Sequence, residues 1–220
     1  QVFDQKKLMS PFSKNYTNLQ NEDPEIEFKN VVSSAFLPPY GPVYIELISA
    51  VAQKIIDKRD FSFKIQKEIN NLEYNDQIIS LLESSKKPVV ILGLENLIDN
   101  TSEVICKITN LLNCPTLVTY KAKGVISDND ENLVGIFTGG KAEQISIIQS
   151  DLIILIGLDP VELILQPWPY DIPVLNISLV NHKVHYVNAE ANLFGDLNFN
   201  LKKYLKYFTK SDWKKAEIKF

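Results

Sequence analysis

The hydrophobic pattern of the chain is clearest at Leu152–Ile156, where five apolar residues follow Asp151 and end at Gly157. A half-exposed strand would alternate polar and apolar residues, so this unbroken run predicts a strand covered on both faces. Such strands are typical of parallel sheets, which bind ligands beyond the carboxyl ends of their strands. The turn formed by Gly157, Leu158 and Asp159 is therefore a candidate site.

Between residues 73 and 207, similar runs alternate with stretches of helical spacing. Strands are predicted at residues 88–92, 115–119, 152–156 and 173–177, with a short fifth strand around residues 186–193. Helices are predicted at residues 101–112, 141–149 and 198–207. Strand, helix and strand at these spacings form right-handed crossovers. We therefore predict an α/β fold with a doubly wound, mostly parallel, Rossmann-like sheet.

Residues 1–57 carry a shorter pattern, with a helix predicted at residues 24–36 and a strand at residues 43–48 after a proline-rich turn. These elements are too few to close a core. Because the chain starts at Gln1 rather than Met, we expect a partial α/β domain whose beginning lies upstream. An uncovered apolar strand at residues 43–48 predicts self-association or poor solubility.

A charged, irregular segment separates the two parts of the chain. The predicted organisation is a partial domain at residues 1–57, a linker at 58–72, an α/β domain at 73–207 and the start of a second linker at 208–220.

Composition narrows the possible partners of the chain. With 220 residues and a formal net charge of -4, it offers no electrostatic reason to bind nucleic acid or an anionic membrane. Arg59 is the single arginine, so a bound anion must rely on backbone amides, lysines or another chain. No apolar stretch is long enough to span a membrane, which predicts a cytoplasmic protein. Cys106 and Cys114 are expected to be reduced, buried, apolar residues.

A glycine-rich loop precedes the helix predicted at residues 141–149. Gly139 and Gly140 stand before Lys141, and free amides beside a lysine can hold an anion. A tight structural turn is the favoured alternative. Residues 120–124 after the second strand, which include Tyr120, Lys121, Lys123 and Gly124, lie at the same edge of the predicted sheet, although loop lysines are usually solvated.

Two further pairs of side chains are candidates for chemistry. Asp159 and Glu162 could act as an acid and a base, but Pro160 favours a helix start with Asp159 as its cap and Glu162 in its first turn. His182 and His185 are spaced like a metal pair, but without nearby acidic or cysteine partners they are expected to be surface histidines. Local motifs thus predict no catalytic residue and no metal site.

The order of segments resembles the thiamine diphosphate-dependent enzymes of the acetolactate synthase and benzoylformate decarboxylase type. Residues 1–5 (QVFDQ), 11–14 (PFSK) and 41–45 (GPVYI) are similar to the end of their pyrimidine-binding domain. Similarity to their central domain lies in KPVVILG, PTLVT, KGVI, Gly135, DLIILIG and GDL, in that order. The resemblance covers nearly the whole chain.

This resemblance implies a fragment of a 2-keto acid lyase or carboligase. The intact parent enzyme would use thiamine diphosphate and magnesium (Mg²⁺), and it would be a homodimer or homotetramer, because subunits of the family share active sites. The family's catalytic glutamate would lie upstream of Gln1, and its metal-binding GDG...N motif downstream of Phe220. The chain is therefore expected to be a scaffold that is inactive alone.

The resemblance also implies two groups of binding residues. Gln1 and Lys14 match positions near the substrate and cofactor cleft of acetolactate synthase-like relatives, although a structural role is equally open. In relatives that bind FAD or ADP, the crevice matches Gly93, Thr138, Gly139, Gly140, Gly157, Leu158 and Asp159. Residues 158–162 replace the arginine-containing segment of acetolactate synthases, which favours an empty crevice. The alternative function is a non-catalytic, nucleotide-binding Rossmann-like module.

Overall fold

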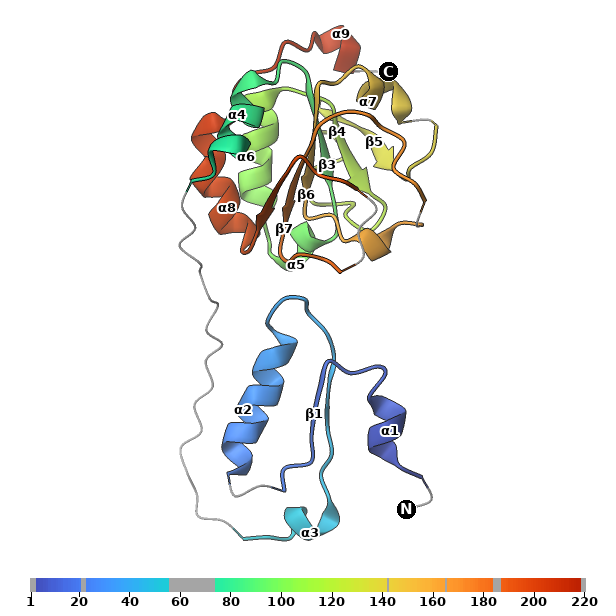
Figure 1. The fold of residues 1–220 in the computed structure, drawn as a ribbon, viewed down its shortest axis with the longest axis vertical. Helices are drawn as coiled ribbons and strands as arrows, with labels where there is room; N and C mark the ends of the chain where they lie inside the picture. The colour runs from blue at the N-terminus through green and yellow to red at the C-terminus, as the bar shows by residue number, and fades with distance from the viewer. Residues whose placement is uncertain are drawn as a thin grey trace. The chain divides into compact units, whose positions relative to one another are not determined.

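A computed structural model describes residues 3–20, 23–55, 74–141, 143–164, 166–183 and 187–218 (Figure 1). The chain divides into two compact units, Gln1–Glu68 and Ile69–Phe220. The whole of the linker predicted at residues 58–72, including Arg59, lies outside the described residues.

The second unit is built on a six-stranded parallel sheet with the strand order β5-β4-β3-β6-β7-β8. The strands are β3 (Pro88–Leu92), β4 (Thr116–Thr119), β5 (Leu133–Phe137), β6 (Leu152–Ile156), β7 (Val174–Ser178) and β8 (Ala191–Phe194). All residues of β3, β4, β6 and β7 are buried. The predicted doubly wound α/β fold is confirmed.

Helices cover the sheet on both faces. Figure 1 shows α4, α6 and α8 on one side and α7 on the other. The helices of this unit are α4 (Asp76–Ser84), α5 (Glu95–Ile98), α6 (Ser102–Leu112), α7 (Gln144–Ile148), α8 (Leu197–Tyr204) and α9 (Lys215–Ile218), with short 3-10 turns η1 (Pro160–Glu162) and η2 (Leu205–Tyr207). Among the described residues, no helix has the length and apolar character needed to cross a membrane.

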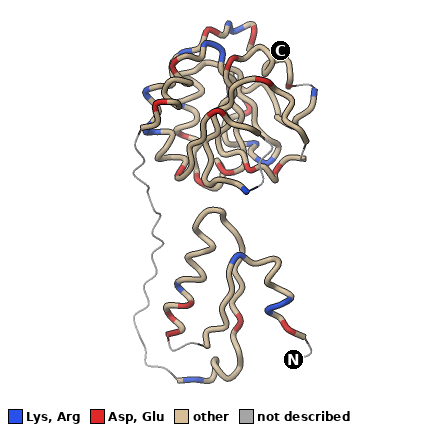
Figure 2. The backbone as a smooth tube through the Cα atoms, in the orientation of Figure 1, with Lys and Arg blue, Asp and Glu red and all other residues tan. Residues whose placement is uncertain are grey.

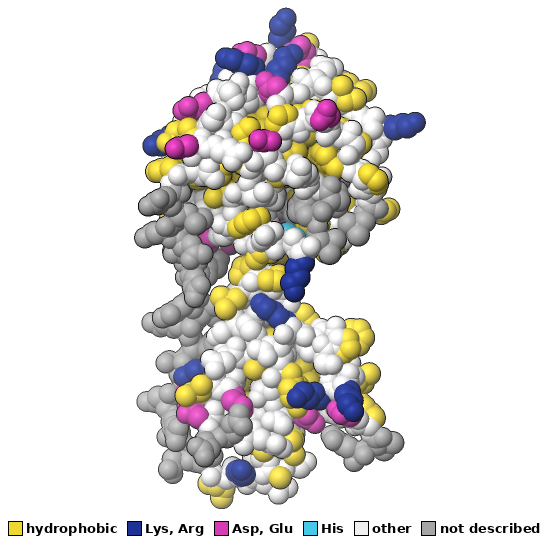
Figure 3. Space-filling view, viewed as in Figure 1, with side chains coloured by type: hydrophobic (Ala, Val, Ile, Leu, Met, Phe, Trp, Pro, Cys, Tyr) yellow, Lys and Arg dark blue, Asp and Glu magenta, His cyan; other side chains and the backbone are white. Residues whose placement is uncertain are grey.

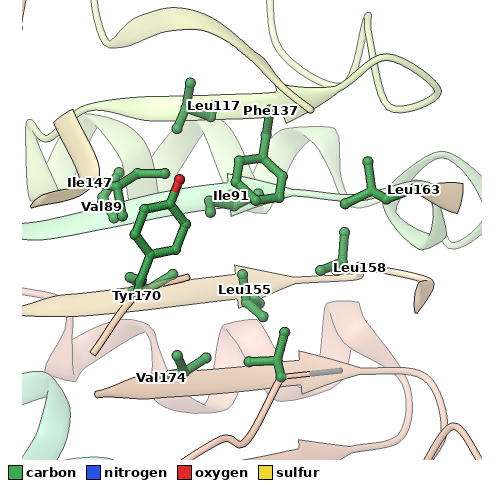
Figure 4. Close-up of a cluster of buried hydrophobic side chains, with 12 residues drawn as sticks. Val89, Ile91, Leu117, Phe137, Ile147, Leu155, Leu158, Leu163, Tyr170 and Val174 are labelled. Atoms are coloured by element: carbon green, nitrogen blue, oxygen red, sulfur yellow. The ribbon is translucent and has the colours of Figure 1, made fainter. Parts of the chain in front are cut away.

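The face of the sheet that carries α7 is also covered by irregular chain. Figure 4 shows side chains of β3, β4, β5 and β6 packed against Ile147 of α7 and against Leu163 and Tyr170, which lie between η1 and β7. Trp168 and Ile172 also pack on this cluster. In the described part of the chain between residues 163 and 173, an aromatic and proline-rich segment thus covers the sheet in the place of a crossover helix.

Several predicted boundaries differ from the structure. The fifth strand, predicted around residues 186–193, is β8 at Ala191–Phe194, and the helix predicted at residues 141–149 is shorter, at Gln144–Ile148. The helix predicted at residues 198–207 is α8 followed by η2. Helix α4 was not predicted, and neither was strand β5, which is only half-buried and is interrupted by Gly135.

The segment after η2, whose first residue is Phe208, packs on the amino-terminal edge of the sheet. The Trp213 side chain is 4% exposed, and its Nε1 donates to the Pro88 carbonyl at 2.8 Å. Lys87 Nζ lies 4.7 Å from the Trp213 ring centre. Phe208 and Ile218 are buried as well. This segment, predicted as the start of a linker, therefore contributes to the core of the second unit.

The first unit contains α1 (Gln5–Met9), β1 (Asn15–Thr17), α2 (Pro24–Ala35), β2 (Val43–Ile45) and α3 (Ser49–Ala52). The predicted helix is confirmed, β1 was not predicted, and the strand predicted at residues 43–48 ends at Ile45. Strands β1 and β2 are parallel, and α2 packs against them. Val31 and Thr17 are its buried residues among those described, so this unit has very little core.

We expect Trp213→Ala to lower the free energy of unfolding of the second unit by about 3–5 kcal/mol, because a large buried ring is lost. Urea denaturation followed by circular dichroism measures this change. Lys215→Ala is the control, since Lys215 is a 70% exposed partner of Glu131 and should change stability very little. An equal effect of both variants would contradict the packing role of Trp213.

We also expect the chain to self-associate through the first unit. Hydrophobic side chains reach the surface of this unit in Figure 3, and Leu47 is 62% exposed. Leu47→Lys should weaken concentration-dependent association in analytical ultracentrifugation, because the charge opposes apolar contact. Ile164→Lys, at an 84% exposed position of the second unit, is the matched control. A wild-type chain that stays monomeric at all concentrations would refute this expectation.

Candidate functional site

The order of the strands places a topological switch point between β3 and β6. The chain runs from β3 outward to β4 and β5, then returns to β6 on the other side of β3. Open α/β sheets bind ligands in the crevice at this point. Gly93 follows β3 and donates through its amide to the Ile156 carbonyl at 2.9 Å. A Cβ atom on Gly93 would lie 2.3 Å from both the Gly157 oxygen and the Leu158 Cα.

Gly93, Gly157 and Leu158 are thus brought together as predicted, but the space between them is filled by protein. Glu162 is 1% exposed, and its Oε1 accepts hydrogen bonds from the amides of Leu94 at 2.9 Å and Asp159 at 3.1 Å. Its Oε2 accepts a hydrogen bond from Thr119 Oγ1 at 2.6 Å. One carboxylate therefore connects the carboxyl ends of β3, β4 and β6.

Burial is the largest influence on the Glu162 carboxyl group and raises its pKa. Hydrogen bonds from Thr119, Leu94 and Asp159 favour the charged form and oppose this rise. Asp159 caps η1 by accepting from the Val161 amide at 3.0 Å, and Asp159 and Glu162 together form a capping box. The predicted capping role of Asp159 is confirmed, whereas the buried contacts of Glu162 were not predicted.

Asn96 holds the backbone at the same crevice through hydrogen bonds to two carbonyls. It is fully buried, and its Nδ2 donates to the carbonyls of Gly93 at 2.9 Å and Ile156 at 2.6 Å. Thr101 Oγ1 donates to Asn96 Oδ1 at 2.9 Å and fixes the orientation of the amide. Gly157 has a φ of 63°, and a Cβ there would lie 2.7 Å from Asn96 Nδ2, so this position requires glycine. Sequence reasoning missed Asn96, because it lies among other polar residues, beside Glu95 and near Asp99, and nothing local marks it as buried.

The amides of the Thr138–Gly140 loop donate hydrogen bonds to a nearby glutamate, Glu143. Glu143 Oε1 accepts hydrogen bonds from the amides of Thr138 at 2.9 Å and Gly140 at 2.7 Å. Although burial acts to raise the pKa of Glu143, the hydrogen bonds from these amides outweigh it, and the net effect is a lowered pKa. Gly139 has a φ of 79° and accepts from Gln166 Nε2 at 3.0 Å. These contacts match the tight structural turn that was the favoured alternative.

Tyr120, after β4, also contacts the Glu162 segment, because its hydroxyl donates to the Glu162 carbonyl. Lys121 is exposed, and Lys123 forms an exposed ion pair with Asp128 at 3.4 Å. The lysines of this loop are therefore solvated, as expected, while Tyr120 is a structural contact.

The prediction of a surface histidine at position 182 is wrong. The His182 side chain is 16% exposed, and its Nε2 lies 2.8 Å from Oε1 of the buried Glu95. Ser178 Oγ donates to the Glu95 carboxylate as well, at 3.0 Å, although the two residues are 83 positions apart in the sequence. No local sequence pattern could reveal this partnership. His185 lies outside the described residues.

The two residues predicted near a cofactor cleft belong to the first unit. Lys14 Nζ donates to the carbonyls of Ser34 at 2.6 Å and Leu37 at 2.7 Å, at and just beyond the carboxyl end of α2. These contacts fit the structural role that was left open for Lys14, because a lysine stabilises the last carbonyls of a helix. Gln1 lies outside the described residues.

The cysteines and acidic residues do not gather into a metal site in the part of the chain that is described. Both cysteines are free; Cys114 is buried and Cys106 is half-buried. Burial raises the pKa of both thiols, which disfavours their reactive form. No group of three or more His, Cys, Asp or Glu side chains among the described residues is placed to hold a metal ion.

Comparison with known proteins identifies the second unit. A family model described as the thiamine pyrophosphate enzyme, central domain, matches residues 75–203. The chain belongs to the thiamine pyrophosphate enzyme family. The matched range contains all six strands of the parallel sheet and helices α4 to α7. The family resemblance found in the sequence is confirmed.

Relatives of this thiamine pyrophosphate enzyme chain include a probable acetolactate synthase large subunit from Methanococcus aeolicus. The two are 26% identical over 222 residues, which cover 94% of this chain and 37% of that protein. The solved benzoylformate decarboxylase from Polynucleobacter necessarius is similar in fold, with a TM-score of 0.74 and 18% identity, over 100% of this chain and 44% of that one.

A thiamine diphosphate-dependent 4-hydroxybenzoylformate decarboxylase from Rhodococcus jostii RHA1 has a TM-score of 0.70 and 17% identity, over 97% of this chain and 42% of that one. At these identities the solved structures establish the fold. The chain spans less than half the length of each relative.

The described residues do not by themselves fit thiamine diphosphate. Diphosphate binding needs unoccupied amides, basic side chains or a bound cation. Here Glu162 accepts from the amides of Leu94 and Asp159, Glu143 accepts from the amides of Thr138 and Gly140, and the ammonium group of Lys14 donates to two carbonyls.

We expect Glu162→Ala to lower the free energy of unfolding by about 2 kcal/mol, because two partly buried amides and the buried Thr119 hydroxyl lose their acceptor. Glu162→Gln should cost less, since its carbonyl oxygen can still accept from Leu94 and Asp159. Urea denaturation of the two variants measures the difference. Equal losses would show that the hydrogen bonds of this carboxylate contribute little.

The same pair predicts a pH dependence. Folding raises the pKa of Glu162, so the folded state binds the proton more tightly than the unfolded state does. The contribution of Glu162 to the free energy of unfolding therefore falls as pH rises from the ordinary pKa of 4.5 through the raised pKa. The stability of wild type relative to Glu162→Gln should fall over this range. Exposed Glu103, whose pKa is lowered by Lys107, should show the opposite sign when replaced by Gln.

Proposed function

We propose that this chain supplies the central domain of a thiamine diphosphate-dependent 2-keto acid lyase or carboligase of the acetolactate synthase-like type. The match of residues 75–203 to the central domain of the family carries this proposal. The likeness to a probable acetolactate synthase large subunit supports the reaction class. When bound, thiamine diphosphate supplies an electron sink for cleavage of the bond beside the keto group.

In this proposal, residues 1–57 are the end of a pyrimidine-binding domain, 58–72 a linker, 73–207 the central domain, and 208–220 the way towards a diphosphate-binding domain. Burial of Phe208 and Trp213 supports extending the central domain beyond residue 207. Other parts of the intact protein would hold thiamine diphosphate and Mg²⁺. We further propose a small 2-keto acid substrate, a cytoplasmic location and a homodimer or homotetramer.

The central domain acts as a scaffold in this proposal, and its crevice binds neither FAD nor ADP. Support comes from Glu162 and Glu143, whose negative charges already use the amides that a phosphate would need. Figure 2 shows acidic and basic residues interspersed along the backbone of this unit. The family match disfavours an independent nucleotide-binding module. Lys14 is proposed to stabilise α2, and a cleft role stays a proposal for Gln1.

Turnover by the intact protein tests the proposed reaction. We expect the full-length protein that contains this chain to release carbon dioxide from a 2-keto acid such as pyruvate only when thiamine diphosphate and Mg²⁺ are present. The 220-residue chain alone should release none. Carbon dioxide formation is measured with a coupled assay in the presence and absence of the cofactor. Cofactor-independent turnover, or turnover by the chain alone, would contradict the proposal.

Calorimetric titration of the 220-residue chain with FAD, ADP and NAD tests the scaffold role. We expect no binding in the micromolar range, because the phosphate-binding amides are already used. Micromolar binding of one nucleotide would instead favour the nucleotide-binding module.

A further inference from the structure

A second buried carboxylate lies at the carboxyl edge of the sheet, apart from the Glu162 network. Glu95 is the first residue of α5, and its side chain is 6% exposed. Its partner His182 stands in the segment that follows β7. Helix α5 follows β3, and β6 lies between β3 and β7 in the sheet. The Glu95–His182 pair therefore connects two segments across the carboxyl end of β6.

Glu95 also orders the backbone of the segment after β7. Its Oε2 accepts a hydrogen bond from the Leu179 amide at 2.8 Å and from Ser178 Oγ at 3.0 Å, while Oε1 lies 2.8 Å from His182 Nε2. Among the described residues, no other basic side chain forms an ion pair with this carboxylate. The positive charge that compensates for its burial is thus available only when His182 is protonated.

We propose that Glu95 and His182 form a pH-sensitive latch, which holds residues 178–182 against α5 when His182 is protonated and loosens them when it is neutral. When His182 is protonated, the hydrogen bond joins two opposite charges and gains a Coulomb attraction that is absent when the imidazole is neutral. A buried carboxylate facing a neutral imidazole keeps its desolvation cost without an opposite charge. Both effects weaken the contact when the proton leaves.

The charged groups that face His182 set the direction of the pH dependence. The hydrogen bond to Glu95 raises the pKa of His182 above its ordinary value of 6.5, burial opposes the rise, and the charges of Glu95 and Asp159 add to it. The folded state therefore binds the proton more tightly than the unfolded state. The latch is complete below the ordinary value and is lost as pH rises through the raised one.

Hydrogen exchange at the Leu179 amide of the 220-residue chain reports on the latch directly. After correction for the intrinsic pH dependence of exchange, protection in the wild type should fall roughly tenfold as His182 loses its proton. His182→Gln should abolish this fall. His185→Gln removes the chain's other histidine and should preserve it. A fall that persists in His182→Gln, or disappears in His185→Gln, would overturn the proposal.

Titration of the His182 ring by nuclear magnetic resonance gives a second readout on the wild-type chain, and so does not depend on whether His182→Gln folds. We expect a pKa above 6.5 that returns towards this ordinary value in Glu95→Gln, which keeps an acceptor for Leu179 but removes the charge. A wild-type value at or below 6.5 would overturn the latch. Neither measurement involves keto acid turnover, so the latch and the proposed function can fail separately.

Discussion

The carboxylate of Glu162 is the contact on which the carboxyl edge of the sheet depends. Parallel strands end with backbone amides that point towards solvent, and the turns after them need acceptors. Glu162 accepts from Leu94 and Asp159 and holds Thr119, so the turns after β3, β4 and β6 are joined at one point. The space beside Gly93 is occupied by Glu162 and by the backbone of Gly157 and Leu158, whereas the space beside Gly157 is occupied by Asn96.

Two further glutamates complete the same edge. Glu143 accepts from the amides of Thr138 and Gly140, and Glu95 accepts from the amide of Leu179. Burying a carboxylate is costly, but several hydrogen bonds to each one offset the cost. In nucleotide-binding sheets, phosphate groups take the corresponding amides. A domain whose own carboxylates fill these positions can keep this edge ordered without a ligand, as a scaffold requires.

Elements that depend on residues close together in the sequence were predicted, and contacts between residues far apart in the sequence were not. Strands β3 and β6 were predicted because burial on both faces leaves an unbroken apolar run, and the Asp159 cap because its partners are within three residues. Strand β5 was missed because it lies at the edge of the sheet, half-buried and interrupted by Gly135. The roles of Glu162 and His182 were not predictable locally, because their partners Leu94 and Glu95 are 68 and 87 residues away in sequence.

The two edges of the sheet are stabilised by different means. At the amino-terminal edge, Asp151 accepts from the amides of Lys86 and Lys87 near the surface, and Trp213 packs its ring there and donates to the Pro88 carbonyl. Screening by water and salt weakens polar contacts at the surface, so packing of the Trp213 ring dominates at this edge. At the carboxyl edge, buried charges dominate, and buried charges respond to protonation. Conditions that change protonation should therefore act first on the turns after β3, β6 and β7, while the amino-terminal edge holds the sheet together.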